Sequence, residues 1–205
     1  MEQYFNPSSH DIDLRQLHDY YEQHGETVIC DKGERLECEG KPVEAFFLVK
    51  QGCFKYITRS AGDGRDHITW FSFEGEFVGD YPNVLYGQPA RFTIEAMTPC
   101  LVLRLSSESL QQFFGQSIEM MKLRSRIGEH LLGQFQTYYM DLHRLTPRER
   151  YEILQRRCPG IINNLPLNAI ASFLHITPKT LSMLRRKSRG GGKKRRQITK
   201  REFDK

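Results

Sequence analysis

The sequence lacks any long apolar run. In its 205 residues, no window approaches the roughly 18 consecutive apolar residues that a transmembrane helix needs. The first residues, MEQYFNPSSHDID, also carry acidic side chains where a secretory signal would have positive charge and an apolar stretch. These absences argue against membrane and secreted proteins. We therefore expect a cytoplasmic protein without a membrane partner.

Cysteine is sparse and irregularly spaced. The five residues are odd in number and share no short regular spacing, unlike the cysteines of a disulfide framework, a tetrahedral zinc site or an iron–sulfur cluster. We expect no metal or cofactor, and reduced thiols mostly in the core: Cys30, Cys38, Cys53, Cys100 and Cys158.

Catalytic motifs are also missing. The best raw material for an enzyme is Asp63, Asp66 and His67 in SAGDGRDHITW, which has the composition of a polar hairpin loop. No nucleophile elbow, phosphate-binding loop, zinc motif or paired carboxylates can be recognised around them. The sequence therefore does not favour an enzyme.

Charge is divided unequally along the chain. Residues 1–145 contain 14 Lys+Arg and 21 Asp+Glu, whereas residues 146–205 contain 16 and 4, so the net charges are −7 and +12. A basic subdomain indicates a polyanionic partner. The alternative, a basic face exposed only to solvent, fits scattered lysines better than a whole subdomain.

Short alternating runs dominate the first half of the chain. After a predicted helix over residues 11–24, segments such as TVIC, AFFLVKQGCFKYITR and CLVLRL are separated by glycines at intervals of 7 to 13 residues. This rhythm predicts an antiparallel β-roll or jelly-roll barrel rather than a parallel sheet with crossover helices. The class is α+β, with a barrel domain over residues 1–116.

A helical pattern of nearly thirty residues follows, from Ser117 to Leu145. A heptad seam can be written with eight positions, six of them apolar and two, Arg124 and Gly128, not; the other six are Met121, Leu131, Phe135, Tyr138, Leu142 and Leu145. Such a seam is typical of a dimerisation helix, and the alternative is a helix packed on its own barrel. Thr146, Pro147 and Glu149 then form an N-cap, a first-turn proline and a capping box, which predict a hinge and a new helix.

The segment LNAIASFLHITPKTLSMLRRK is the most specific signal and predicts a helix-turn-helix within a domain over residues 146–187. The small residue needed where the two helices cross is Ala171. Every large apolar position is filled: Ile170, Leu174, Ile176, Leu181 and Leu184. Thr177 and Pro178 form an N-cap and first helical position, while His175 stands where glycine is usual because the residue takes positive φ.

The second helix of this motif presents a polar outer face. The predicted DNA-binding residues are Thr177, Lys179, Thr180, Ser182, Met183, Arg185, Arg186 and Lys187. Lys179 and Ser182 can bind base edges, Met183 can contact a thymine methyl group, and the last three can pair with phosphates. The alternative is a helical hairpin with a basic exterior. Residues 188–205 predict a basic, disordered tail with no assigned site.

This order of parts resembles the Crp/Fnr family of transcription regulators over about residues 10–187, with its best local matches in GCFKYI, FVGDYPNVLYGQPARFTIEA and the helix-turn-helix. The resemblance implies a cyclic-nucleotide-binding-like barrel, a dimerisation helix and a winged-helix-like DNA-binding domain. It also implies duplex DNA, a second copy of the chain and RNA polymerase as partners.

The same resemblance places a tentative effector pocket at Gly79, Asp80, Arg91 and Phe135. Family members that bind cyclic AMP carry a Gly-Glu turn and an Arg-Ser pair, but an ungapped match puts Ala90 and Arg91 at the pair. Arg91 would then point to the opposite face of a strand, unless a bulge restores it. Phe135 would occupy the volume of the base. We therefore expect an unidentified small effector, or none, rather than cyclic AMP.

Two functions remain open. The first is a homodimeric, DNA-binding transcription regulator of the Crp/Fnr type. The second is a small-molecule-binding module whose helical C-terminal part docks protein rather than DNA. Binding to duplex DNA that falls steeply with salt distinguishes the first from the second.

Overall fold

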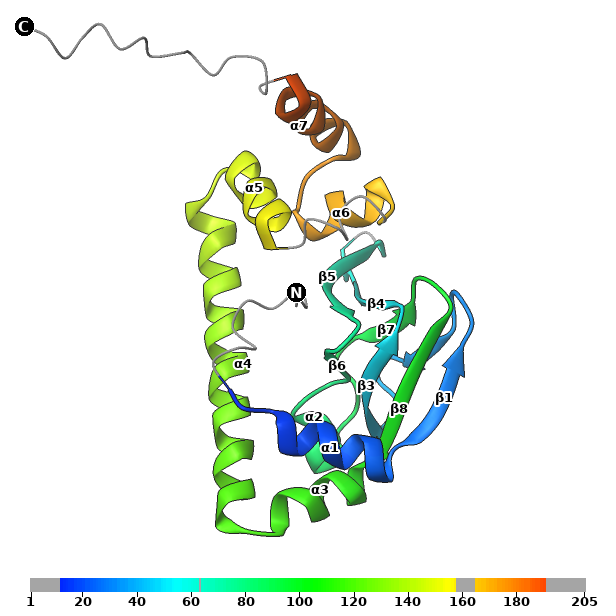
Figure 1. Ribbon diagram of the computed structural model, residues 1–205. Helices are drawn as coiled ribbons and strands as arrows, with labels where there is room; N and C mark the ends of the chain where they lie inside the picture. Colours follow the sequence, from blue (N-terminus) through cyan, green and yellow to red (C-terminus); the bar gives the residue numbers. More distant parts are fainter. Residues whose placement is uncertain (1–11, 63, 158–164, 191–205) are drawn as a thin grey trace, which may run out of the picture.

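The computed structural model describes residues 12–62, 64–157 and 165–190, which form a barrel, one long helix and a helical C-terminal unit (Figure 1). This arrangement confirms the predicted α+β class and the order of parts. Asp63, Cys158 and residues 191–205 of the basic tail lie outside the described residues. The last helix continues to Gly190, three residues into the segment for which we expected a disordered tail.

The barrel consists of two four-stranded antiparallel sheets. The first has the order β1 (Glu26–Cys30), β8 (Cys100–Ser106), β3 (Ala45–Gln51) and β6 (Phe77–Val78). The second has the order β2 (Arg35–Glu37), β7 (Thr93–Ala96), β4 (Cys53–Arg59) and β5 (Asp66–Phe73). The glycine-punctuated runs therefore form the predicted antiparallel roll.

Alternating side chains of the two sheets build the core of the barrel. Val49, Phe54, Ile94 and Val102 are fully buried between the sheets. Burial of these apolar side chains supplies the main driving force for the roll. The thiols of Cys30, Cys53 and Cys100 are buried and reduced, as predicted for most of the cysteines.

Helices close one end of the barrel. In Figure 1, α1 (Arg15–His24, blue) crosses that end, with α3 (Ser107–Gly115, green) beside it. Their apolar faces share a second core with the start of the long helix, including Leu17, Tyr21, Phe113 and Leu123. The N-terminal helix was predicted, whereas α2 (Asn83–Tyr86) and α3 were not.

The long helix α4 (Ile118–Arg144) leads from the barrel to the C-terminal unit of α5 (Pro147–Arg157), α6 (Leu167–Phe173) and α7 (Pro178–Gly190). The predicted capping box separates α4 from α5: the Thr146 amide donates to Glu149 Oε2 at 2.8 Å, and the Glu149 amide donates to Thr146 Oγ1 at 3.3 Å. Each side chain thereby satisfies a free amide at the start of α5.

The C-terminal unit packs directly on the barrel. Phe173 of α6 lies against Phe71 of β5, with ring centroids 5.3 Å apart. The Ile68 amide of the same strand donates to Ser172 Oγ at 2.9 Å. The apolar core of the helices is therefore continuous with Phe71 and Phe73 of the barrel, so α6 and β5 are packed together within the chain.

Candidate functional site

Helices α6 and α7 form the predicted helix-turn-helix. Ile170, Ala171, Leu174 and Leu181 are buried, while Ile176 and Leu184 pack at the edge of the same core. A small residue at Ala171 lets the two helices approach closely. The sequence prediction for the interior of this motif is confirmed.

The turn between these helices also has the predicted geometry. His175 has φ +53°, and it is the only positive-φ residue other than glycine in the part of the chain that the structure describes. Burial lowers the pKa of its imidazole, and the charges of Arg150 and His67 act in the same direction. Thr177 then caps α7 by accepting a hydrogen bond from the Thr180 amide at 3.1 Å. These features direct α7 away from α6 after a short turn.

The outer face of α7 is polar and basic. Lys179, Ser182, Met183 and Arg186 are exposed, whereas Thr180 and Arg185 lie at the half-buried flanks. In Figure 1, α7 lies beyond α6 at the end of the molecule away from α1 and α3. Recognition helices present a polar outer face of this kind to a major groove. Thr177 is exposed at the start of the same helix, and Lys187 lies farther along its backbone.

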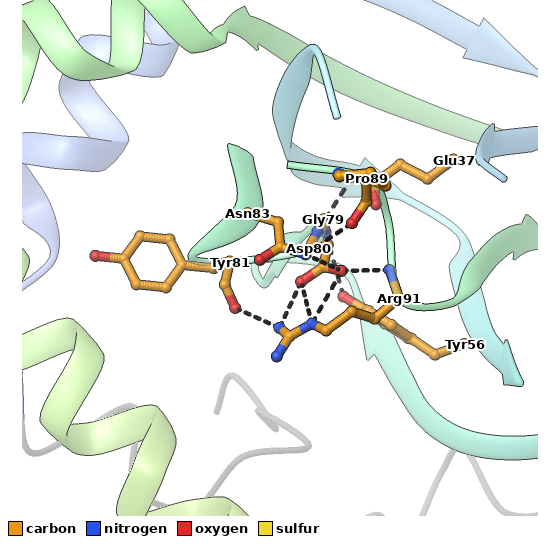
Figure 2. A network of polar contacts seen from close by, with 8 residues as sticks. All are labelled: Glu37, Tyr56, Gly79, Asp80, Tyr81, Asn83, Pro89 and Arg91. Atoms are coloured by element: carbon orange, nitrogen blue, oxygen red, sulfur yellow. Dashed lines mark hydrogen bonds and ion pairs between the residues drawn. The ribbon is translucent and has the colours of Figure 1, made fainter. Parts of the chain in front are cut away.

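The barrel residues of the predicted effector pocket form a closed ion-pair network (Figure 2). Asp80 is fully buried, and its carboxylate accepts from Arg91 through Nε at 3.1 Å and Nη2 at 2.5 Å, as well as from the Arg91 amide at 2.7 Å. Arg91 Nη2 also donates to the Tyr81 carbonyl at 3.2 Å. The buried carboxylate is therefore paired with the guanidinium of Arg91, whose side chain is 56% exposed.

The sequence left two orientations open for Arg91, and in the structure its guanidinium pairs with Asp80. Arg91 precedes strand β7, so the alternation of side chains along a strand does not decide where it points. Gly79 has φ +148°, and a Cβ atom there would lie 2.2 Å from the Phe46 ring. Glycine thus lets the chain pass close to Phe46 and carry Asp80 inward.

Other residues of this network escaped the sequence analysis. Glu37 Oε1 accepts from the Asp80 amide at 3.1 Å, and burial raises the pKa of the Glu37 carboxyl to about 7. The Gly79 amide donates to the Tyr56 hydroxyl at 3.3 Å, which lies 3.1 Å from Ser72 Oγ. Glu37 comes from a distant strand, so no local motif signalled its role.

Phe135, the fourth residue of the tentative pocket, lies on α4. Its ring is 5.8 Å from Trp70 of β5 and is about half exposed. The structure thus brings Gly79, Asp80 and Arg91 together, whereas Phe135 contacts an aromatic residue of the barrel, Trp70.

Two residues of the predicted seam on α4, Leu131 and Tyr138, are not among the exposed apolar side chains of this helix. The exposed apolar side chains of this helix are Ile118, Met121, Leu132, Phe135, Tyr139 and Met140. Tyr138 instead turns inward, where it stacks on Phe173 at 5.4 Å and donates to the Phe173 carbonyl at 3.1 Å. Leu131 is half-buried. The stripe open to a partner therefore contains Leu132 and Tyr139 rather than Leu131 and Tyr138.

Within the described residues, no helix has the length and apolar character needed to cross a membrane. The same part of the chain contains no cluster of three or more His, Cys, Asp or Glu residues suited to a metal ion.

Comparison with known proteins adds two findings. Residues 27–117 match the family model of the cyclic nucleotide-binding domain. No curated protein matches the sequence significantly.

Several solved structures share the fold. FixK2 from Bradyrhizobium japonicum superposes with a TM-score of 0.71 at 21% identity, covering 82% of this chain and 86% of that one. The c-di-GMP-responsive global regulator CLP of Xanthomonas campestris gives 0.64 at 16%, covering 88% and 93%. A CooA mutant from Carboxydothermus hydrogenoformans gives 0.63 at 17%, covering 83% and 78%. The likeness spans barrel, long helix and C-terminal unit together.

Proposed function

Because residues 27–117 form a cyclic nucleotide-binding domain in a chain with the fold of Crp/Fnr transcription regulators, we propose that this protein regulates transcription by binding duplex DNA as a homodimer. We further propose that the protein acts in the cytoplasm and that RNA polymerase is another of its partners. The observation that carries it is the exposed polar face of α7, described above.

Chemistry and charge support this role for α7. Lys179 and Ser182 stand near the start of the helix, where recognition helices contact base edges. Arg185 and Arg186 lie one to two turns later, within reach of phosphates. The net charge of +12 over residues 146–205 adds attraction for a polyanion. We infer that α7 reads the major groove.

The exposed stripe of α4 supports the dimer. Leu132, Phe135 and Tyr139 are each more than half exposed and lie at spacings of three and four residues along one face of α4. Large exposed apolar patches of this kind are typical of protein interfaces. A second copy related by a two-fold axis buries both stripes against each other and doubles the number of recognition helices.

The barrel takes an effector other than cyclic AMP, or none. Asp80 already engages the Nε–Nη2 fork of Arg91, so a cyclic phosphate would have to compete with this carboxylate for it. Releasing that fork would leave the fully buried Asp80 carboxylate without its charged partner.

The test is selection of bound fragments from random duplex DNA by the full chain, followed by affinity measurements at increasing salt. A DNA regulator retains particular sequences, and the logarithm of its affinity falls linearly with the logarithm of salt concentration. The triple variant K179A/S182A/R186A should lose selection. The double variant K32A/K41A, which removes the same number of charges from exposed barrel turns, should retain it. A wild-type chain that retains no duplex DNA would instead favour a protein-docking role.

A further inference from the structure

Arg150 of α5 connects the ends of two other helices. Its Nη1 donates to the carbonyl oxygens of Leu142 at 3.1 Å and Leu145 at 2.9 Å, at the end of α4. Its Nη2 donates to the carbonyl of Leu174 at 3.1 Å, directly after α6. Nε of the same guanidinium is buried and has no acceptor among the described residues. The side chain is therefore engaged inside the protein rather than directed at solvent.

These contacts satisfy groups that a helix cannot satisfy alone. The last four carbonyl groups of an α-helix have no partner within it, and they carry the negative end of the helix dipole. One cation between two such ends is favourable toward both helices at once. The planar guanidinium suits this position because its donors point in fixed, different directions.

The last turn of α6 receives donors from two further elements. The Tyr138 hydroxyl of α4 donates to the Phe173 carbonyl at 3.1 Å, next to the carbonyl bound by Arg150. Ser172 Oγ accepts from the amide of Ile68 on β5 at 2.9 Å. Three consecutive residues at the end of α6, Ser172 to the C-cap Leu174, are thereby held by α4, α5 and β5. His175, the left-handed residue that starts the turn into α7, follows immediately.

We propose that Arg150 is a positioning residue for DNA recognition: by joining the ends of α4 and α6, it fixes the angle between the dimer helix and α7. This inference rests on the proposed function. In a dimer, that angle sets the distance and rotation between the two recognition helices. Arg150 therefore determines which spacing of operator half-sites is bound, although it is not a DNA contact itself.

The experiment compares R150Q, R150K and R148Q with the wild-type chain on the selected operator and on versions with one base pair added or removed between half-sites. Arg148 is the matched control, because it lies on the same helix but is exposed and paired with Glu152. One base pair rotates a half-site by about a tenth of a turn. The wild type should bind the operator with its preferred spacing about tenfold or more tightly than the altered operators. Loss of contacts worth one charged hydrogen bond has an effect of this size.

In R150Q the ratio of the affinities for the preferred and the altered spacing should fall toward one. R150K should behave similarly, because a compact ammonium group keeps the charge but cannot reproduce the fork. R148Q should retain the wild-type preference. An R150Q chain that keeps its spacing preference overturns the proposal, and so does one whose only change is a lower salt slope, which is the mark of a lost phosphate contact.

Amide hydrogen exchange tests, without DNA, whether Arg150 holds the ends of α4 and α6 together. Exchange should accelerate together around residues 142–146 and 172–176 in R150Q and R150K but not in R148Q, because local opening follows the loss of these contacts. Faster exchange confined to α5 would contradict the connection of α4 and α6 by Arg150. If the wild type binds no duplex, the proposed function fails on that result alone, and hydrogen exchange still decides whether Arg150 connects the two helices.

Discussion

Arg91 neutralises the buried carboxylate of Asp80, with two guanidinium nitrogens 2.5 Å and 3.1 Å from the same oxygen, Oδ1. A buried charge is costly unless it is paired and hydrogen-bonded. Removal of the arginine therefore leaves a buried carboxylate without a charged partner. We expect R91A to lower the free energy of unfolding by about 1–3 kcal/mol in urea titrations, a range reduced because Arg91 is half exposed.

Arg35 provides the control for this measurement. Its side chain is 55% exposed, against 56% for Arg91, but it pairs with Glu95, which retains some solvent contact. R35A should therefore cost less than about 1 kcal/mol. Equal losses in the two variants would show that burial of Asp80 does not strengthen its dependence on Arg91.

The same ion pair predicts that cyclic AMP does not bind. A ligand present at 100 times its dissociation constant stabilises a fold by roughly 2.7 kcal/mol. Because Asp80 occupies the guanidinium fork of Arg91, millimolar cyclic AMP should leave both the melting temperature and the DNA affinity unchanged. A rise of several degrees in differential scanning fluorimetry would show that the nucleotide displaces Asp80.

Glu37 predicts a pH dependence of stability. Burial raises the pKa of its carboxyl to about 7, above the value of 4.5 expected in the unfolded chain. The stabilisation that the protonated Glu37 carboxyl contributes to the folded state is therefore fully present below about pH 4.5. It is lost as pH rises through 7, because the unfolded chain releases the proton first. The loss is on the order of 3 kcal/mol.

The variant E37Q keeps an oxygen for the Asp80 amide but cannot titrate. Urea unfolding of the wild type between pH 5 and pH 8 should show a decline that is smaller in E37Q. Identical pH profiles for the two proteins would mean that Glu37 titrates normally in the folded chain.

The sequence predicted best where the signals are local. The N-cap at Thr177, the positive φ of His175 and the apolar positions around Ala171 each depend on a few neighbouring residues, and all are confirmed. Backbone conformation at such sites is limited mainly by the residue itself and its immediate hydrogen bonds. The capping box at Thr146 and Glu149 belongs to the same class.

The sequence prediction failed where a side chain's environment depends on elements far away in the chain. The heptad pattern of α4 offers aromatic side chains at both Tyr138 and Tyr139, and only the docking of α6 turns Tyr138 inward. Glu37 lies 43 residues before Asp80 in the sequence, so the contact of these residues depends on the closed barrel. The direction of the Arg91 side chain could not be derived from strand alternation, because Arg91 precedes strand β7.

The exposed stripe of α4 predicts which residues hold the proposed dimer. Charges at Leu132 and Tyr139 would be buried in the proposed interface, so L132E/Y139E should sediment as a monomer at concentrations where the wild type is a dimer. The variant Y138F removes only the hydroxyl that contacts Phe173, so it should remain dimeric. A wild-type chain that is monomeric at micromolar concentration would contradict the interface itself.

The last prediction separates base readout from phosphate binding on α7. If each protomer places this helix in a major groove, the two helices of a dimer lie roughly 34 Å apart and the operator is an inverted repeat with half-sites about one turn apart. K179A and S182A should each weaken binding by about 1–3 kcal/mol and relax the preference at particular base pairs. Arg186 lies farther along the exposed face, so R186A should weaken binding to all sequences alike and lower the salt slope by about one. Selection experiments and salt titrations on the three variants measure both effects. If K179A and S182A select the same operator as the wild type, another surface must read the DNA, because loss of a base contact necessarily changes the preference at the base that it read.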